Sequence, residues 1–259
     1  MEGPKFTMRL SGVSWTLPAR PAAAAPAERF RILRSGVGAT PACHPVEVLC
    51  WDDFLPRAVR DDLFASISDE TRCSYAPSKV SKGAEGDAQV DENRRRSLVL
   101  QNQQARDLLL PRLAGPRQVA LDRAGYGKVP LGATEVQVTA SGDGDHFGVH
   151  TDDGVEGGRY FLRLVTFVYY LHRQPRPFSG GALRVYDSQM SDDGWEPAAT
   201  WIDVDPVDNR LVMFLSDRYH EVLRVECESD RLADRRFTVN GWFSSERDLR
   251  ELGDGGAQG

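Results

Sequence analysis

The sequence predicts a mainly β protein with flanking helices, built as a sandwich or jelly roll. Hydrophobic residues make up 41% of the 259 residues and charged residues 27%, which is ordinary globular usage. Beyond Gly132 apolar residues alternate with polar ones, which is typical of half-buried strands. About seven short strand candidates follow one another without a helical segment between them, and this order favours packed antiparallel sheets.

The N-terminal part of the chain predicts a peripheral segment. Residues 15–30 combine prolines with an alanine tract and keep no apolar period, which suits a linker or a surface strap. We therefore expect residues 1–45 to form an extension and residues 46–248 to form a single domain. Its jelly-roll core is expected at about 133–245, and residues 249–259 are expected to form a frayed tail.

Two helices are predicted before the strands. Residues 56–68 carry apolar side chains at helical spacing behind a proline that suits a first turn, and residues 102–113 show a similar inward face. Residues 78–93 are polar and contain glycines, so they predict a loop. This loop is either a surface connector or a lid over a site.

The strand candidates are separated by Gly, Pro, Asp and Asn turn residues. They lie at 136–138, 164–171, 182–186, 200–204, 210–215, 220–225 and 236–243. In the last strand, side chains alternate between the two faces, so one face carries a polar set and the other an apolar set. The polar set is Arg236, Thr238, Asn240 and Trp242, and the apolar set is Phe237, Val239 and Phe243.

Charge and composition exclude several classes of partner. The chain has 32 Lys and Arg against 38 Asp and Glu, so the net charge of −6 argues against nucleic acid and disfavours a strongly acidic partner. No apolar stretch is long enough to span a membrane and no secretion signal is evident, so we expect a cytoplasmic protein. The four cysteines form no CxxC pair and are expected to be reduced, which leaves histidines and carboxylates to bind any metal.

Three residues are candidate metal ligands. His150 and Asp152 are two positions apart, so on an extended strand they project to the same face, and His220 on a distant strand can complete the set. Two imidazoles and one carboxylate on one side of an ion leave the opposite positions open, as non-haem Fe(II) oxygenases require. An HxD pair by itself is also common in polar loops.

Arg236 predicts an anionic ligand. Its guanidinium lies on an otherwise apolar strand, where burial requires a partner, and a carboxylate matches the planar fork of its N–H groups. If no protein carboxylate pairs with Arg236, an acidic ligand is expected to do so.

These features occur in an order that resembles the prolyl 4-hydroxylase-like branch of the Fe(II)- and 2-oxoglutarate-dependent dioxygenases. The resemblance runs from about Glu135 to Phe243. The segments that carry it are the HxD at His150 and Asp152, RLVTFVYYL at 163–171, SGGAL at 179–183, NRLVMF at 209–214, HEV at 220–222 and RFTVNGWF at 236–243. It implies a double-stranded β-helix, which is a distorted jelly roll, with helices on its outer sheet.

Carried over by position, the resemblance makes His150, Asp152 and His220 the Fe(II) ligands. It makes Arg236 the partner of the distal carboxylate of 2-oxoglutarate. Tyr170 is either a second hydrogen bond to that carboxylate or a core aromatic. Two further residues, Thr166 and Asn240, face the same cavity as cofactor contacts or serve as satisfied polar core residues.

Candidate substrate contacts are His146, Arg163 and Trp242. The tyrosine and glycines that often precede the HxD in this family are absent, because residues 139–147 read TASGDGDHF. His146 lies four residues before His150, but the Gly and Asp residues around it disfavour a helix, so we expect it at the pocket mouth. The basic run 94–96 is either a substrate contact or a solvated face.

The resemblance implies an oxygenase that uses Fe(II), 2-oxoglutarate and O2. Such an enzyme hydroxylates an unactivated C–H bond of an amino acid, a peptidyl residue or a natural-product intermediate and releases succinate and CO2. A small-molecule or peptide substrate follows, and desaturation or ring formation stays open. Two alternatives are a cupin-like metal enzyme that does not use 2-oxoglutarate and a non-catalytic scaffold. Arg236 argues against the first, because that reaction needs no dicarboxylate clamp.

Overall fold

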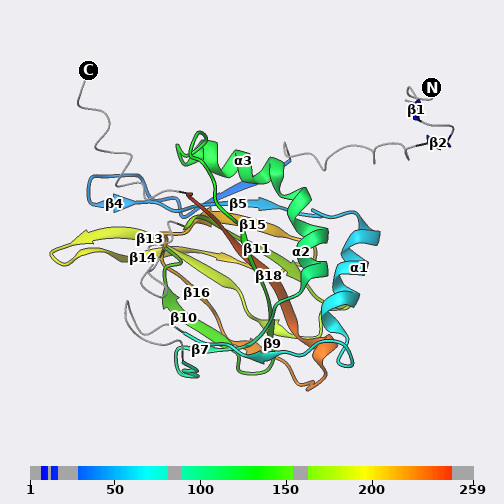
Figure 1. Cartoon of the computed structure of the whole chain (residues 1–259). Coiled ribbons are helices and arrows are strands. Elements are labelled where there is room, and N and C mark those ends of the chain that lie inside the picture. The colour runs from blue at the N-terminus through cyan, green and yellow to red at the C-terminus, as the bar shows by residue number, and fades with distance from the viewer. Residues whose placement is uncertain (1–6, 11–12, 17–28, 81–88, 154–162, 247–259) are drawn as a thin grey trace.

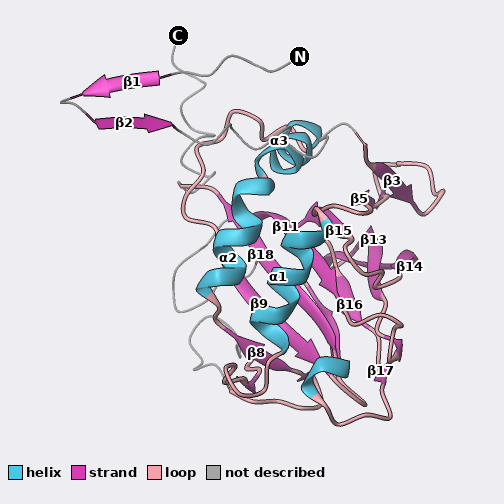
Figure 2. Ribbon diagram, turned by 90° about the vertical axis from the view of Figure 1, so that its right-hand side faces the viewer, coloured by secondary structure: helices cyan, strands magenta, loops and turns pink. Residues whose placement is uncertain are grey.

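The computed structural model describes residues 7–10, 13–16, 29–80, 89–153 and 163–246. Two antiparallel sheets face each other, and three helices cover the outer face of the larger one (Figures 1 and 2). The helices are α1 (Arg57–Ser68), α2 (Gln103–Leu109) and α3 (Ala114–Arg123), with short 3-10 turns at Leu110–Arg112 and Leu232–Asp234. This architecture confirms the predicted mainly β jelly roll with flanking helices.

The larger sheet has eight strands. Their spatial order is β3 (Arg31–Arg34), β5 (Glu47–Trp51), β15 (Leu211–Leu215), β11 (Arg163–Leu171), β18 (Arg236–Ser244), β9 (Glu135–Ser141), β8 (Leu98–Leu100) and β6 (Ala76–Pro77). β11 and β18 are its central strands, and their pairing runs from Arg163 opposite Ser244 to Leu171 opposite Phe237.

The smaller sheet carries the strands expected to hold the histidines. Its order is β14 (Gly194–Val204), β13 (Leu183–Ser191), β16 (His220–Val222), β10 (His146–His150) and β7 (Arg95–Arg96), with β4 (Cys43–His44) also paired to β13. Two further pairs are β1 (Thr7–Leu10) with β2 (Val13–Thr16) and β12 (Ser179–Gly180) with β17 (Val225–Glu226).

Side-chain alternation in β11 and β18 separates two cores. One set of apolar residues packs under the helices and includes Phe167, Tyr169, Phe237 and Val239. The opposite faces of β11 and β15 pack against β13 and β14 between the sheets. The polar face predicted for β18 therefore points between the sheets, where a cavity lies.

The predicted helices match the structure in part. Helix α1 begins directly after Pro56, as expected, and buries Leu63 and Ile67. The helix expected over 102–113 is shorter, because α2 ends at Leu109 and the chain continues as a 3-10 turn that contains Pro111. Helix α3 was not predicted from the sequence.

The structure also bears on the expected N-terminal extension, the strand at 220–225, the polar loop, the tail and the cysteines. β3 and β4 lie within residues 1–45, where we expected an extension, and both pair with strands of the main sheets. The strand expected at 220–225 is divided between β16 and β17. Residues 81–88 of the expected loop and the tail 249–259 lie outside the described residues. The four cysteines are free, and none of the described helices is long and apolar enough to cross a membrane.

Candidate active site

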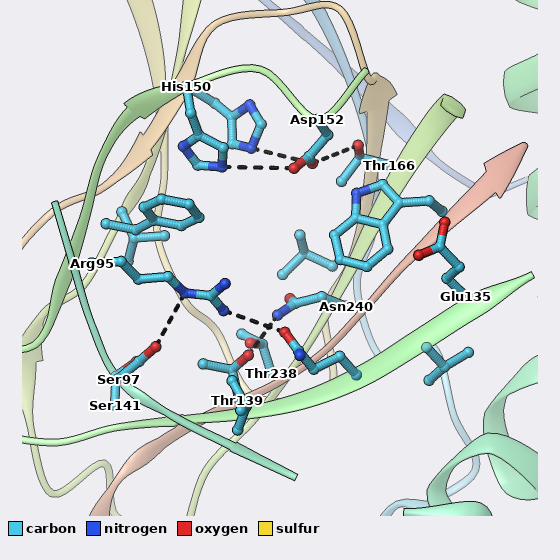
Figure 3. Close-up of a pocket in the computed structure, with 18 of the residues that line it drawn as sticks. Arg95, Ser97, Glu135, Thr139, Ser141, His150, Asp152, Thr166, Thr238 and Asn240 are labelled. Carbon is cyan, nitrogen blue, oxygen red and sulfur yellow. Dashed lines mark hydrogen bonds and ion pairs between the residues drawn. The ribbon is translucent and has the colours of Figure 1, made fainter. Parts of the chain in front are cut away.

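A cavity of about 1240 Å³ opens between the two sheets. Its wall combines β7, β10 and β16 from the smaller sheet with β9, β11 and β18 from the larger one. Figure 3 shows His150 and Asp152 at one end of this space and Arg95, Ser97 and Thr139 across from them. The ten candidate metal, cofactor and substrate residues named from the sequence line this cavity, and so do Arg94 and Arg95, but not Arg96, of the basic run 94–96.

The three candidate metal ligands converge. One ligand atom from each of His150, Asp152 and His220 lies within 4.8 Å of the other two. The Nε2 atom of His150 is 3.6 Å from Oδ1 of Asp152, and Nε2 of His220 is 3.3 Å from Oδ2. Ligands bind a divalent transition metal at about 2.1 Å, so neighbouring octahedral positions are about 3 Å apart. The spacing therefore fits one ion.

Backbone carbonyls orient both imidazoles. The Nδ1 atom of His150 is 2.8 Å from the carbonyl oxygen of Gly148, and Nδ1 of His220 is 2.8 Å from that of Arg218. Each Nδ1–H can donate to its carbonyl, which leaves the lone pair of Nε2 directed at the carboxylate. This is the arrangement that holds a metal-binding histidine in the correct tautomer.

Charge within the cluster also suits a cation. Burial and the neighbouring His220 lower the pKa of His150 to about 3, so this imidazole is neutral. Burial by itself would raise the pKa of Asp152, but the facing His220 lowers it well below its usual range. Burial opposes the charged form of His220 as well, yet Asp152 raises its pKa. An ionised carboxylate between two imidazoles is the donor set that the chemistry of Fe(II) requires.

The placement of Asp152 corrects one sequence expectation. β10 ends at His150, so Asp152 does not share an extended strand with it. The backbone N–H of Asp152 instead donates to the carbonyl of Ser216 at 2.8 Å, and this turn directs the carboxylate inward. The hydroxyl of Thr166 donates to Oδ2 of Asp152 at 2.8 Å and lies 3.0 Å from the hydroxyl of Ser216. Thr166 therefore contacts a candidate metal ligand directly.

We expect the Thr166→Val variant to bind Fe(II) about 10- to 100-fold more weakly, because hydrogen bonds to a ligating group commonly contribute this much to metal affinity. Valine keeps the shape but cannot donate to Asp152. Titration of the apoprotein with Fe(II) under nitrogen measures the change. Thr166→Ser restores the donor and is expected to recover the affinity; equal affinity in the valine variant would show that Thr166 does not position Asp152.

Arg236 is a buried cation without a carboxylate partner among the described residues. Only 3% of its surface is exposed, burial lowers its pKa, and its Nε atom has no hydrogen-bond partner. The guanidinium carbon lies 5.2 Å from the ring centroid of Tyr170, whose hydroxyl is also buried and unpartnered. Burial raises the pKa of Tyr170 to about 12, so the phenol keeps its proton as a donor. These donors in one cavity fit a carboxylate ligand.

Gly181 makes room for the side chain of Arg236. A Cβ atom at Gly181 would lie 2.7 Å from Cδ of Arg236 and 2.9 Å from Val225, and the φ of Gly181 is +69°. We expect Gly181→Ala to displace Arg236 and to raise the Michaelis constant for 2-oxoglutarate without removing the charge. Gly194→Ala is the matched control, because Gly194 also has positive φ (+113°) but nothing lies within 4 Å of its Cβ position. Equal constants in both variants would contradict this role.

Arg163, a candidate substrate contact, is bound within the wall of the cavity. Its guanidinium donates to both carboxylate oxygens of Glu135 at 3.0 and 2.7 Å and to the carbonyl of Asp152 at 3.3 Å. It also lies 4.0 Å from the ring centroid of Trp242. Arg163 thus connects β9 and β18 to the turn that holds Asp152.

The remaining candidates lie farther from the metal cluster. Asn240 donates to the hydroxyl of Thr139 at 2.9 Å, and Figure 3 shows both on the side of the cavity away from Asp152. His146 lies at the start of β10, with its ring nitrogens 3.2 Å from the carbonyls of Gly144 and Asn93. Among the described residues it belongs to no metal-binding group.

Sequence reasoning missed a polar wall and a stacked pair. Glu135, Gln137 and Thr139 alternate with valines along β9, and this period-two pattern was the signal that identifies a face of the cavity. The phenyl ring of Phe147 stacks on His150 with ring centroids 3.6 Å apart, and the guanidinium carbon of Arg95 lies 4.7 Å from the ring centroid of Phe147. No local pattern predicts the contact between Arg95 and Phe147, because β7 and β10 are far apart in the chain.

Comparison with known proteins shows what the region around this site is similar to. Residues 136–244 match the 2OG-Fe(II) oxygenase superfamily, in which 2OG denotes 2-oxoglutarate. A PKHD-type hydroxylase of Synechocystis sp. is 35% identical over 123 residues, which are 48% of this chain and 40% of that protein. The chain therefore spans less than half the length of this curated relative.

Solved structures agree with that match. A prolyl-4-hydroxylase of Pseudomonas putida is 25% identical with a TM-score of 0.51, covering 76% of this chain and 92% of the other. A prolyl hydroxylase of Trichoplax adhaerens, solved with a peptide fragment of hypoxia inducible factor, shares the fold at 17% identity and a TM-score of 0.54, covering 82% and 87%. Residues 136–244 thus resemble the 2OG-Fe(II) oxygenase superfamily, an enzyme class that uses Fe(II), 2-oxoglutarate and O2, and the chain is similar to prolyl 4-hydroxylases within it.

Proposed function

We propose that this protein hydroxylates an unactivated C–H bond of a peptidyl residue and converts 2-oxoglutarate to succinate and CO2. One observation carries the proposal: the buried Arg236, without a carboxylate partner among the described residues, lines the same cavity as the His150, Asp152 and His220 cluster. A metal site alone suits many reactions. A metal site with an unpaired guanidinium in the same cavity suits a reaction that consumes a dicarboxylic acid.

Different residues of the cavity would bind the metal, bind 2-oxoglutarate and exclude water. His150, Asp152 and His220 would hold Fe(II) on one side, and the open side would supply the oxidising chemistry with O2 and the 2-oxo acid. Arg236 and Tyr170 would bind the distal carboxylate and so fix the orientation of 2-oxoglutarate. Apolar residues such as Val168 and Leu183, which line the same cavity, exclude water from this end of it.

Two of the structural relatives support a peptide over a free amino acid. The P. putida relative is a prolyl-4-hydroxylase, and the T. adhaerens relative was solved with a peptide. Proline within a peptide is therefore the first target to test, before free amino acids or natural-product intermediates.

The test is a screen of the purified full chain with Fe(II), 2-oxoglutarate and O2. Prolyl peptides, free amino acids and a sample without substrate are compared for succinate release and for a mass gain of one oxygen atom. A peptide that gains oxygen with matching succinate supports the proposal. Turnover of a substrate without 2-oxoglutarate would favour the cupin-like alternative. Binding of peptides without turnover under any condition would favour a scaffold.

A further inference from the structure

The cavity has the opposite charge balance from the chain as a whole. The full sequence has more acidic than basic residues, 38 against 32. Among the described residues that line the cavity, cations outnumber carboxylates. The cations are Lys79, Arg94, Arg95, Arg106, Arg163 and Arg236, and the carboxylates are Glu135 and Asp152.

Both carboxylates have roles that the site already explains. Glu135 pairs with Arg163 in a two-point ion pair, and Asp152 faces the two histidines. Arg236 is assigned to 2-oxoglutarate under the proposed function. Arg95 bonds Ser97 and Gln137 within the wall. Three cations, Lys79, Arg94 and Arg106, are then not needed by the reaction centre.

These three cations come from separate segments around the cavity, and we call them the cationic rim. Lys79 follows β6, Arg94 precedes β7 and Arg106 belongs to α2. None of them has a carboxylate within ion-pair distance in the part of the chain that the structure describes. Arg106 donates only to the carbonyl of Thr134, at 2.8 Å. Lys79 and Arg94 are exposed to solvent at the edge of the cavity.

The main chain of Arg94 is bonded to the strand that carries His150. Its carbonyl accepts a hydrogen bond from the N–H of Gly148 at 2.7 Å, and Gly148 lies two residues before His150 on β10. The backbone of Arg94 therefore lies beside the strand that carries His150, whereas Arg106 lies on α2, so a ligand that contacts both residues extends along the cavity wall. Cations spread over three elements suit an extended ligand with several negative groups better than one small anion.

We propose that the substrate is an acidic peptide segment, whose Asp or Glu side chains flank the target residue and pair with Lys79, Arg94 and Arg106. This inference rests on the proposed function and specifies its substrate class. A cavity lined by one sign of charge focuses its field and concentrates ligands of the opposite sign. The net charge of the chain disfavours acidic partners at long range, so the selection occurs at the rim itself.

The experiment measures binding separately from turnover. Three short peptides share a central proline and differ only in flanking residues, which are glutamate, glutamine or lysine. Calorimetry without O2, in the presence of metal and saturating 2-oxoglutarate, gives each affinity for the full chain. The wild type is compared with the triple variant Lys79→Gln, Arg94→Gln and Arg106→Gln. A matched control, Arg57→Gln with Arg72→Gln and Lys128→Gln, removes the same charge from residues outside the cavity lining.

The wild type is expected to prefer the glutamate peptide, and added salt is expected to reduce that preference. The rim variant is expected to lose about tenfold or more of its affinity for the glutamate peptide, because three ion pairs with the peptide are lost together. The glutamine peptide and the control variant are expected to show no such loss. Succinate release with each peptide is expected to follow the same order.

Other outcomes overturn the inference in distinguishable ways. Equal affinity for the three peptides, or no measurable binding of any, would refute the acidic-peptide assignment. If N-acetylglutamate competes as well as the glutamate peptide, the rim selects small carboxylates and the peptide assignment is wrong. Hydroxylation of all three peptides at equal rates would refute the inference and leave the proposed hydroxylation intact. Rim-dependent binding without any hydroxylation would support the inference and refute the proposed function.

Discussion

The His220→Ala variant is expected to lose Fe(II) binding and 2-oxoglutarate turnover while remaining folded. Removing this imidazole leaves one histidine and one carboxylate, and two protein ligands hold Fe(II) too weakly for a stable open site. Metal content after loading and dialysis measures the loss, and circular dichroism measures the fold. The same result is expected for His150→Ala and Asp152→Ala.

His146→Ala is the matched control for that prediction. His146 lies on the same strand as His150 and lines the same cavity, but it is outside the metal-binding cluster. It is expected to keep the wild-type metal content. Normal metal content and turnover in His220→Ala would remove the basis of the ligand assignment.

The Arg236→Gln variant is expected to bind 2-oxoglutarate at least about 30-fold more weakly and to keep its Fe(II). Glutamine retains much of the volume but cannot form the ionic pair, and losing one partner of a buried pair costs about 2 to 5 kcal/mol. The Michaelis constant for 2-oxoglutarate measures the change. A thermal shift on adding 2-oxoglutarate provides a second readout, because a ligand that binds only the folded state raises its melting temperature.

Arg123→Gln is a suitable control for Arg236→Gln, because Arg123 forms an ion pair with Glu47 at 2.8 Å and is not part of the cavity lining. It is expected to leave both readouts unchanged. Tyr170→Phe is expected to weaken 2-oxoglutarate binding less than Arg236→Gln, since it removes a neutral donor and not a charge. An unchanged Michaelis constant in Arg236→Gln would assign the clamp to another residue.

Local patterns were sufficient for much of the fold. Alternation along residues 236–243 predicted which side chains of β18 face the helices and which face the cavity, because side-chain direction in a strand has a period of two. Helix α1 was similarly predicted from its apolar spacing. Helix α3 was missed because its buried residues, Pro116, Ala120 and Leu121, are mostly small and give a weak apolar signal.

The expected site was identified by residue types in a recognisable order. His150, Asp152 and His220 were selected because two imidazoles and one carboxylate can bind one metal, and Arg236 because a buried guanidinium needs a partner. All four line one cavity. The expectation that Asp152 continues the strand of His150 was wrong. A hydrogen bond to Ser216, 64 positions away, decides where that carboxylate points, and no local period contains this information.

The identity of the chain's residues therefore determined which groups are able to bind a metal and a dicarboxylate, since donor chemistry belongs to each side chain. Only the tertiary structure decided how those groups are supported and what surrounds them. Thr166 and Ser216 reach Asp152, Gly181 admits Arg236, and the cationic rim gathers from three separate segments. The net charge counts every charged residue of the chain, whereas a substrate contacts only the side chains that folding brings to the cavity. The positive charge of the cavity lining was therefore recognised only in the folded chain.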